Sequence, residues 1–325
     1  MSEQNGILYA AEVRGDGHGA LLTSDEATHS IAADTLAWVH LDGRHPEARH
    51  WIETEISYLD PLIIEALLAE ETRPRIVEFD QGALLILRGV NLNADADPED
   101  MVSVRLWVDR SRIVSVQLRS LKAVRDIQDR LANGTGPRNS GEFVAALTGR
   151  LFERMEPVMT ALGEQMDDLE EAVMDNPSVN ERQAINGLRK RAIILRRYLA
   201  PQRDVIGYLR STEFAWLETP ARRRLQENLD RITRYLEDLD AIRERGQIIK
   251  DELASGLADR MNRNLYVLSV IAALFLPLGF LTGLLGINVG GIPGTDSGMA
   301  FTIVVALMAG IGVGQALLFR WLKWI

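Results

Sequence analysis

The residues with the clearest potential for chemistry are polar side chains set in two long apolar segments near the C-terminus. From Asn264 to Phe319 the only formal charge is Asp296. Polar groups are costly inside a membrane, and those found there tend to serve an ion or substrate pathway. Carboxamide oxygens can hold a cation that keeps its water, whereas removing that water needs charged or imidazole ligands, which the two segments lack. The polar residues in and beside these segments include Asn262, Ser269, Thr282, Asn288 and Gln315.

Residue types that often carry catalysis show no usable spacing. The five histidines all fall within the first 50 residues, and none forms an HExxH or other paired motif. No nucleophile elbow, Walker loop or dinucleotide fingerprint is present. The chain has no cysteine, which excludes disulfides and thiolate ligands and fits a reducing compartment. We therefore expect no enzyme, no catalytic residue and no cofactor.

Acidic residues are concentrated in the segment EQMDDLEEAVMD (164–175). One interpretation is that these carboxylates attract cations toward a membrane pore. The favoured alternative is a solvated helix face, with Leu162, Met166, Leu169 and Val173 packed inward. The net charge of −10 over 325 residues argues against a nucleic-acid partner.

The first part of the chain, residues 1–140, is predicted to form a cytoplasmic α/β domain. Short β-like runs alternate with brief helical patterns, and Asp60-Pro61 is a typical helix start. A hairpin is expected to turn near Asp109–Arg112, and GDGHG (15–19) reads as a second hairpin. The N-terminus MSEQNGILYA lacks the pattern of a secretory signal.

Residues 141–263 are predicted to be a cytoplasmic helical region. Apolar residues from Ile185 to Leu209 recur at spacings of three and four, as in a coiled coil, with Gln202 as one polar member. Pro201 predicts a kink. A stalk helix over about 220–287 would be about 100 Å long. It needs partner helices, because such a rod cannot bury its surface alone.

Residues 264–325 are predicted to form a transmembrane domain. Two helices, over about 265–287 and 299–319, are each long enough to cross a bilayer, and residues 288–298 form an external loop. Basic residues lie before the first helix and after the second. Because basic residues favour the cytoplasmic side of a membrane, both chain termini are expected in the cytoplasm. The alternative is a helical hairpin buried in a soluble core. A single pair of spans encloses no pathway, so a pore would require several chains.

Two stretches carry a family resemblance. NRNLYVLSVIAALFLPLGFLTGLLGIN (262–288) resembles the pore helix of the CorA-type divalent cation transporters, including Pro277 and the closing Gly286-Ile287-Asn288. The loop GINVGGIPG (286–294) has Ile in place of Met and no Glu, so it resembles the zinc-transporting ZntB branch rather than the magnesium and cobalt branch. LRRYLAPQRDVI (195–206) is similar to the same branch, and the resemblance covers essentially the whole chain.

The resemblance implies a CorA-like fold and a homopentamer in a bacterial inner membrane, with Zn²⁺ as the transported substrate and proton-coupled uptake favoured. It places a selectivity ring at the outer mouth, made by Gly286, Ile287 and Asn288, where Asn288 would hold a hydrated ion without direct ligation. Asn288 also suits a helix C-cap, which is compatible with that role. Gly279 departs from the small hydroxyl residue common in the family. The implied pore-lining residues are Asn262, Leu268, Leu276 and Gly279.

Two alternatives stay open from the sequence. One is a magnesium and cobalt channel of the same family. The other belongs to a different class of protein: a membrane-anchored coiled-coil scaffold, in which the two spans serve only as an anchor. The two classes differ at Asn288, because a scaffold would tolerate its substitution.

Overall fold

The structure is a computed structural model of the 325-residue chain, and it describes residues 6–33, 35–57, 59–175, 179–287, 294 and 297–323. Its contacts divide into two compact units, Met1–Lys250 and Asp251–Ile325, which we call the N-terminal unit and the C-terminal unit. Helix α8 (Thr219–Leu285) contributes residues to both. The predicted boundaries after residues 140 and 263 do not coincide with this division.

The N-terminal unit is built on a seven-stranded sheet with the order β2-β1-β3-β7-β6-β5-β4. Neighbouring strands are antiparallel except for β3 and β7, which run parallel. The predicted hairpin turn near residues 109–112 is confirmed, because β6 ends at Asp109 and β7 begins at Arg112. The strands are β1 (Ile7–Val13), β2 (Gly19–Leu21), β3 (Ala37–Asp42), β4 (Arg75–Phe79), β5 (Gly82–Gly89), β6 (Val102–Asp109) and β7 (Arg112–Gln117).

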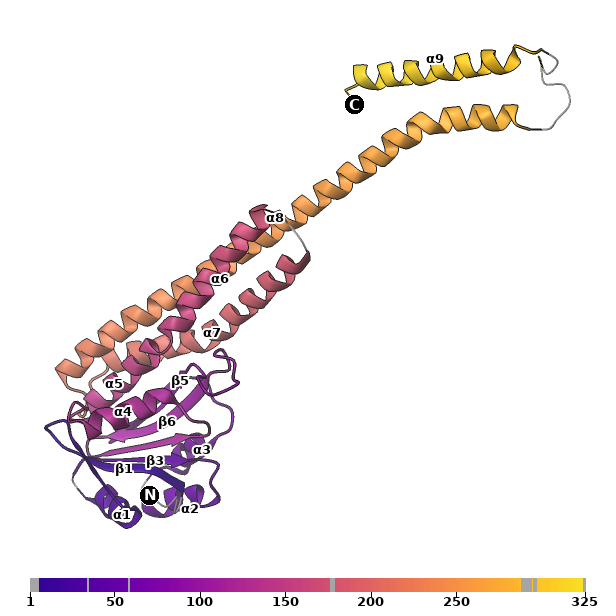
Figure 1. Ribbon diagram of the computed structural model, residues 1–325. Coiled ribbons are helices and arrows are strands. Elements are labelled where there is room, and N and C mark those ends of the chain that lie inside the picture. The colour runs from indigo at the N-terminus through magenta and orange to yellow at the C-terminus, as the bar shows by residue number, and fades with distance from the viewer. Residues whose placement is uncertain are drawn as a thin grey trace. The chain divides into compact units, whose positions relative to one another are not determined.

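Helices cover both faces of the sheet (Figure 1). Helices α1 (Ser24–Ala32), α2 (Pro46–Glu55) and α3 (Pro61–Leu68) lie on one face, and α4 (Lys122–Ala132) and α5 (Ser140–Glu153) on the other. The predicted start of α3 is confirmed: Asp60 is its N-cap, and a carboxylate oxygen accepts the N–H of Leu62 at 2.8 Å.

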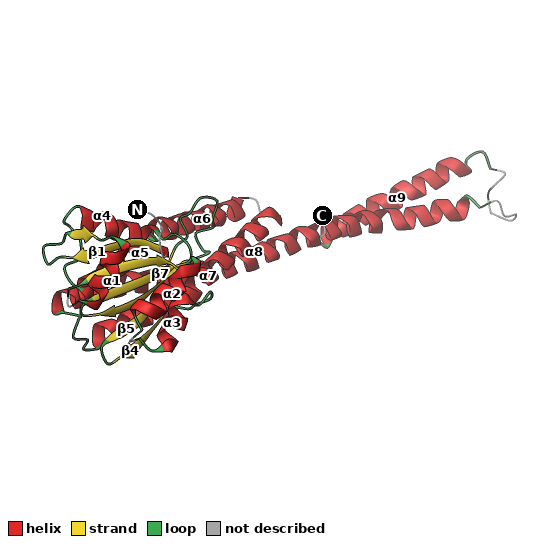
Figure 2. Cartoon of the chain, turned by 90° about the horizontal axis from the view of Figure 1, so that it is seen from below, coloured by secondary structure: helices red, strands yellow, loops and turns green. Residues whose placement is uncertain are grey.

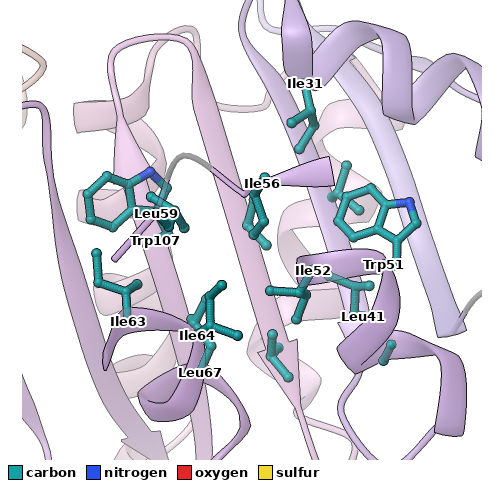
Figure 3. Close-up of a cluster of buried hydrophobic side chains, with 14 of the residues drawn as sticks. Ile31, Leu41, Trp51, Ile52, Ile56, Leu59, Ile63, Ile64, Leu67 and Trp107 are labelled. Carbon is teal, nitrogen blue, oxygen red and sulfur yellow. The ribbon is translucent and has the colours of Figure 1, made fainter. Parts of the chain in front are cut away.

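The core under α1–α3 is a continuous apolar cluster (Figure 3). Trp51, Ile52 and Ile56 from the α2 region meet Ile63 and Leu67 of α3, and all are at most 4% exposed. Alternation along the strands explains the second core, because neighbouring residues of a strand point to opposite faces. Val39 belongs to the cluster of Figure 3, whereas the ring of Trp38 packs against Phe143 of α5 with 4.7 Å between the centroids.

Three further helices complete the N-terminal unit: α6 (Glu156–Asp175), α7 (Val179–Ser211) and the first part of α8. Helix α7 continues through Pro201. On α6, Leu162 and Met166 are fully buried, Val173 is 4% exposed and Leu169 is half-buried, which confirms that this apolar stripe faces inward. The acidic face is partly neutralised, since Arg245 of α8 pairs with Asp167 at 2.7 Å and also with Glu170.

Gln202 joins α7 to the sheet. Its side-chain oxygen accepts the backbone N–H of Arg88 at 2.7 Å, and its amide donates to the Arg88 carbonyl at 3.0 Å. Strand β4 pairs with β5 only as far as Ile86, so Arg88 lies beyond the last paired residue. Gln202 therefore supplies the two hydrogen bonds that a neighbouring strand would make, which explains a fully buried polar residue in an apolar seam.

The C-terminal unit contains the last part of α8 and the antiparallel helix α9 (Ala300–Trp321), seen together in Figures 1 and 2. Both helices are long and apolar enough to cross a membrane, with mean hydropathies of 2.3 and 2.1 over their most apolar windows. None of the residues in those windows is buried, so this unit exposes its apolar side chains where the N-terminal unit hides them.

Candidate functional site

Helix α9 covers only one side of the membrane-length part of α8. The half-buried residues of α8 recur every three or four positions, as expected for one helix face against a neighbour. They are Val270, Ala273, Leu274, Leu278 and Leu281. The face that α9 leaves open carries three of the predicted pore-lining residues: Leu268, Leu276 and Gly279 are all exposed.

Gly279 lies in a hollow of the open face. Apart from its chain neighbours and the nearby backbone of α8, no atom comes within 4 Å of the place where a Cβ would stand, so the glycine is not required by packing inside one chain. The hollow measures about 800 Å³ and is lined by apolar residues that include Phe275, Leu276 and Phe280. Leu276 is 76% exposed and Phe280 is 70% exposed. A surface of this kind calls for lipid or another protein chain.

The hydroxyl groups of this segment are engaged within α8. Ser269 donates to the carbonyl of Leu265 at 2.8 Å, and Thr282 donates to the carbonyls of Leu278 and Gly279 at 3.1 and 3.0 Å. A serine or threonine that returns its proton to its own helix has little left to offer a ligand except oxygen lone pairs. The open face therefore presents carbon and weak dipoles.

The helix ends at the predicted selectivity segment. The N–H of Gly286 donates to the carbonyls of Thr282 and Gly283 at 2.9 and 3.2 Å, which closes the last turn. Ile287 follows and is half exposed. Asn288, together with most of the loop after it, lies outside the described residues. At the other end of the segment Asn262 is exposed, as are the flanking Arg260 and Arg263.

Among the described residues, no group of three or more His, Asp or Glu side chains could hold a metal ion. The buried His40 cannot start one alone. Its Nδ1 lies 2.7 Å from the hydroxyl of Ser115, and burial lowers the pKa of His40 to about 4. The open face of α8 is thus suited to a cation that keeps its water, because it offers nothing to replace that water.

Sequence reasoning noted Pro277 and Gln315 separately but missed their connection. Gln315 of α9 donates its side-chain amide to the carbonyl of Ala273 at 3.4 Å, and residue 273 is four positions before Pro277. A second feature it missed is a polar cavity of about 540 Å³ in the N-terminal unit, where Arg88 stacks over the ring of Tyr198 at 4.3 Å. The only sequence signal for the contact between Gln315 and Ala273 is that residue 273 lies four positions before Pro277.

Known proteins resemble this chain over nearly its whole length. The family model described as CorA-like Mg2+ transporter protein matches residues 33–321. A divalent cation transporter, CmaX of Pseudomonas aeruginosa, is 37% identical over 326 residues, covering 99% of this chain and 98% of that protein. The zinc transport protein ZntB of Yersinia enterocolitica is 35% identical over 310 residues, covering 95% of this chain and 94% of that protein.

Solved structures agree. The full-length CmaX structure superposes with a TM-score of 0.84 at 37% identity and covers 98% of each chain. The CorA magnesium transporter of Methanocaldococcus jannaschii gives a TM-score of 0.81 at 17% identity, covering 98% of this chain and 99% of that one, which shows the fold alone. The predicted fold class, an α/β domain with a long helix and two C-terminal spans, is confirmed. The chain therefore belongs to the CorA-like Mg2+ transporter family, a family of membrane transporters and not of enzymes.

Proposed function

We propose that this protein is a divalent cation transporter whose principal substrate is Zn²⁺, taken up through a pore that several copies build together. The observation that carries the proposal is the open apolar face of α8, which α9 leaves uncovered and which bears Leu268, Leu276 and Gly279. One chain encloses no pathway, so the pore needs a ring of copies, and the family resemblance favours five. The setting is a bacterial inner membrane with both termini in the cytoplasm.

In this proposal the open face of α8 forms the pore wall. Leu268 and Leu276 are the apolar constrictions, which can gate a pore by excluding water. Gly279 widens the space between them and the outer mouth, because it has no side chain to fill the hollow. Asn262 lies at the inner mouth. Each of these residues is exposed in the single chain, as a pore-lining residue must be.

Selectivity is assigned to the ring of Gly286, Ile287 and Asn288 at the outer mouth. Copies of Asn288 would present side-chain oxygens to an ion that keeps its water, with help from carbonyl groups at the end of the helix. The open face supports this mode of binding, since it carries neither carboxylate nor imidazole. Zinc is favoured by the 35% identity to ZntB and by a loop sequence without Glu. No residue of the spans is an obvious proton relay, so proton coupling rests on the resemblance.

The decisive experiment is Asn288→Ala in protein reconstituted in liposomes, with Zn²⁺ flux as the readout. We expect most of the flux to be lost while the assembly survives. The matched control is Asn186→Ala, the same chemical change at an exposed site on α7. Unchanged flux in the Asn288 variant would reject the selectivity ring and favour the membrane-anchored scaffold.

Substrate and coupling need separate measurements. Uptake of Zn²⁺ is compared with uptake of Mg²⁺, each with and without an inward proton gradient. Preference for Mg²⁺ would favour the channel that the family name suggests. Zinc uptake that ignores the gradient would remove proton coupling alone. Native mass spectrometry tests the pentamer, and any other subunit number would reject that part of the proposal.

A further inference from the structure

Pro277 leaves a gap in the hydrogen-bond ladder of α8. In an α-helix the N–H of each residue donates to the carbonyl four residues earlier, so the carbonyl of Ala273 normally receives the N–H of residue 277. Proline has no N–H to give. Inside a membrane there is no water to take its place, so the carbonyl stays unsatisfied unless another side chain reaches it.

Gln315 reaches that carbonyl. The amide nitrogen Nε2 of Gln315 lies 3.4 Å from the oxygen of Ala273. Ala300–Trp321 contains no other carboxamide side chain, and the remaining residues around Gln315 are apolar or glycine. The one strong side-chain donor in the middle of α9 therefore meets the one carbonyl of the facing helix that a proline has freed.

The contact also fixes which way the amide points. If the side chain were reversed, its oxygen would face the Ala273 oxygen, and two acceptors would repel each other. In the orientation observed, Oε1 of Gln315 is buried and has no hydrogen-bond partner within the described part of the chain. A buried acceptor without a partner carries a cost. The hydrogen bond from the amide nitrogen of Gln315 to the Ala273 carbonyl must therefore offset this cost.

We infer that Gln315 is a positioning residue that holds α8 in one conformation at Pro277 and so sets where Leu276 and Gly279 stand on the open face. Ala273 lies on the side of α8 that faces α9, whereas Leu276 and Gly279 lie on the opposite side of the same turns. The hydrogen bond from Gln315 therefore acts on the turns that carry both residues. A proline in a helix permits a range of bends. The bond from α9 selects one of them. The conformational effect stands by itself, while its consequence for cation flux rests on the proposed function.

A double-mutant cycle tests the inference with four proteins: the natural chain, Gln315→Leu, Pro277→Ala and the double variant. Pro277→Ala restores an N–H to the ladder, which makes the Gln315 donor redundant. The natural chain has no cysteine. Spin labels can therefore be placed at Val267 and Leu284, two exposed sites outside the proposed pore wall. Labelled chains are diluted with unlabelled ones in membranes, and the distance between the two labels reports the bend.

In the natural background, Gln315→Leu is expected to shift the ratio of label-distance populations by roughly 3- to 20-fold, the range for one interhelical hydrogen bond in a membrane. With Pro277→Ala present, the same change is expected to shift it less than about twofold. Thr302→Val removes another polar group from α9 at an exposed site and serves as the control. It should leave the distances unchanged.

Two results would overturn the inference: distances unaffected by Gln315→Leu, or an equal shift in both backgrounds. If Gln315→Leu does not assemble, adding Pro277→Ala must restore assembly, and failure to restore it also overturns the inference. Cation flux is measured on the same samples. Distances that shift while flux does not would support the positioning role and count against the proposed pore wall, so the two failures are distinguishable.

Discussion

The two units of this chain use the same apolar residues in opposite ways. Leu85 in β5 is fully buried, while Leu276 in α8 is 76% exposed. In the N-terminal unit the apolar side chains of the core are covered by their own chain, so their burial stabilises the fold directly. In the C-terminal unit the cover must come from lipid or from other copies. Hydrophobicity alone therefore does not indicate the role of a residue, because that role depends on whether its own chain, lipid or another copy covers the side chain.

The largest expected effect comes from separating the units. Residues 1–250, made without the rest of the chain, should fold and stay soluble without detergent, because the buried clusters of that unit lie within it. The full chain should require detergent or lipid, since no residue in the apolar windows of α8 and α9 is buried. Size-exclusion chromatography and circular dichroism check both. Aggregation of residues 1–250 would show that the N-terminal unit does not fold without the rest of the chain.

The same substitution in each unit should separate stability from transport. Leu85→Ala removes a fully buried side chain and should lower the free energy of unfolding by roughly 2–5 kcal/mol. Leu276→Ala should leave thermal unfolding of the N-terminal unit unchanged and alter cation flux instead. Unfolding curves and liposome flux are measured for both variants. A loss of stability from Leu276→Ala would mean that the exposed face already serves the fold.

Acid should weaken only the N-terminal unit. Burial lowers the pKa of His40 from 6.5 to about 4, against smaller upward effects of Gln117, Ser115 and Asp42. The unfolded chain therefore binds a proton that the folded chain refuses between these values. The stabilising contribution is full above pH 6.5 and is lost as the pH falls toward 4, on the order of 3 kcal/mol.

The measurement is denaturant unfolding of residues 1–250 across that range of pH. His40→Asn keeps a polar partner near the Ser115 hydroxyl and should flatten the curve between pH 4 and 6.5. The same substitution at the exposed His29 is the control. A variant curve as steep as the natural one would show that other groups cause the acid sensitivity.

A smaller effect is expected where α7 meets the sheet. Gln202→Leu leaves the N–H and carbonyl of Arg88 without their partners and should cost about 2 kcal/mol of stability. Gln183→Leu makes the same change at an exposed site on α7 and should cost little. Denaturant unfolding gives both values. Equal values would mean that water replaces Gln202 at the sheet.

Much of the fold could be predicted from local patterns. The alternation of strand residues, the Asp60-Pro61 helix start and the gap in charge after Asn264 each indicate one element within a short window. The pairing of Gln202 with Arg88 could not be predicted this way, because it joins residues 114 positions apart. At Gly246 the sequence indicates only a weak point in a helix. In the structure a Cβ at this position would come within 2.7 Å of Cγ of Arg189, so a larger residue would have to displace that side chain.

The candidate site could also be predicted only in part from the sequence. The spans and their polar residues follow from composition, and the family resemblance supplied Leu268, Leu276 and Gly279. Composition could not show which face of α8 is left open, because the part of the helix after Asn264 is apolar on all sides. Only the packing of α9 against Ala273 and its neighbours distinguishes the faces. Asn288 lies outside the described residues, so its role remains a prediction.

The Gln202 side chain also protects the N-terminal unit from strand pairing with other copies of itself. A strand with free N–H and carbonyl groups invites an incoming strand from another molecule, which leads to misassembly. Beyond Ile86 the outer side of β5 would be such an edge. Because Gln202 already occupies the hydrogen-bonding groups of Arg88, an intruding strand would have to displace a helix. This contact therefore protects the edge of β5 from pairing with a strand of another molecule.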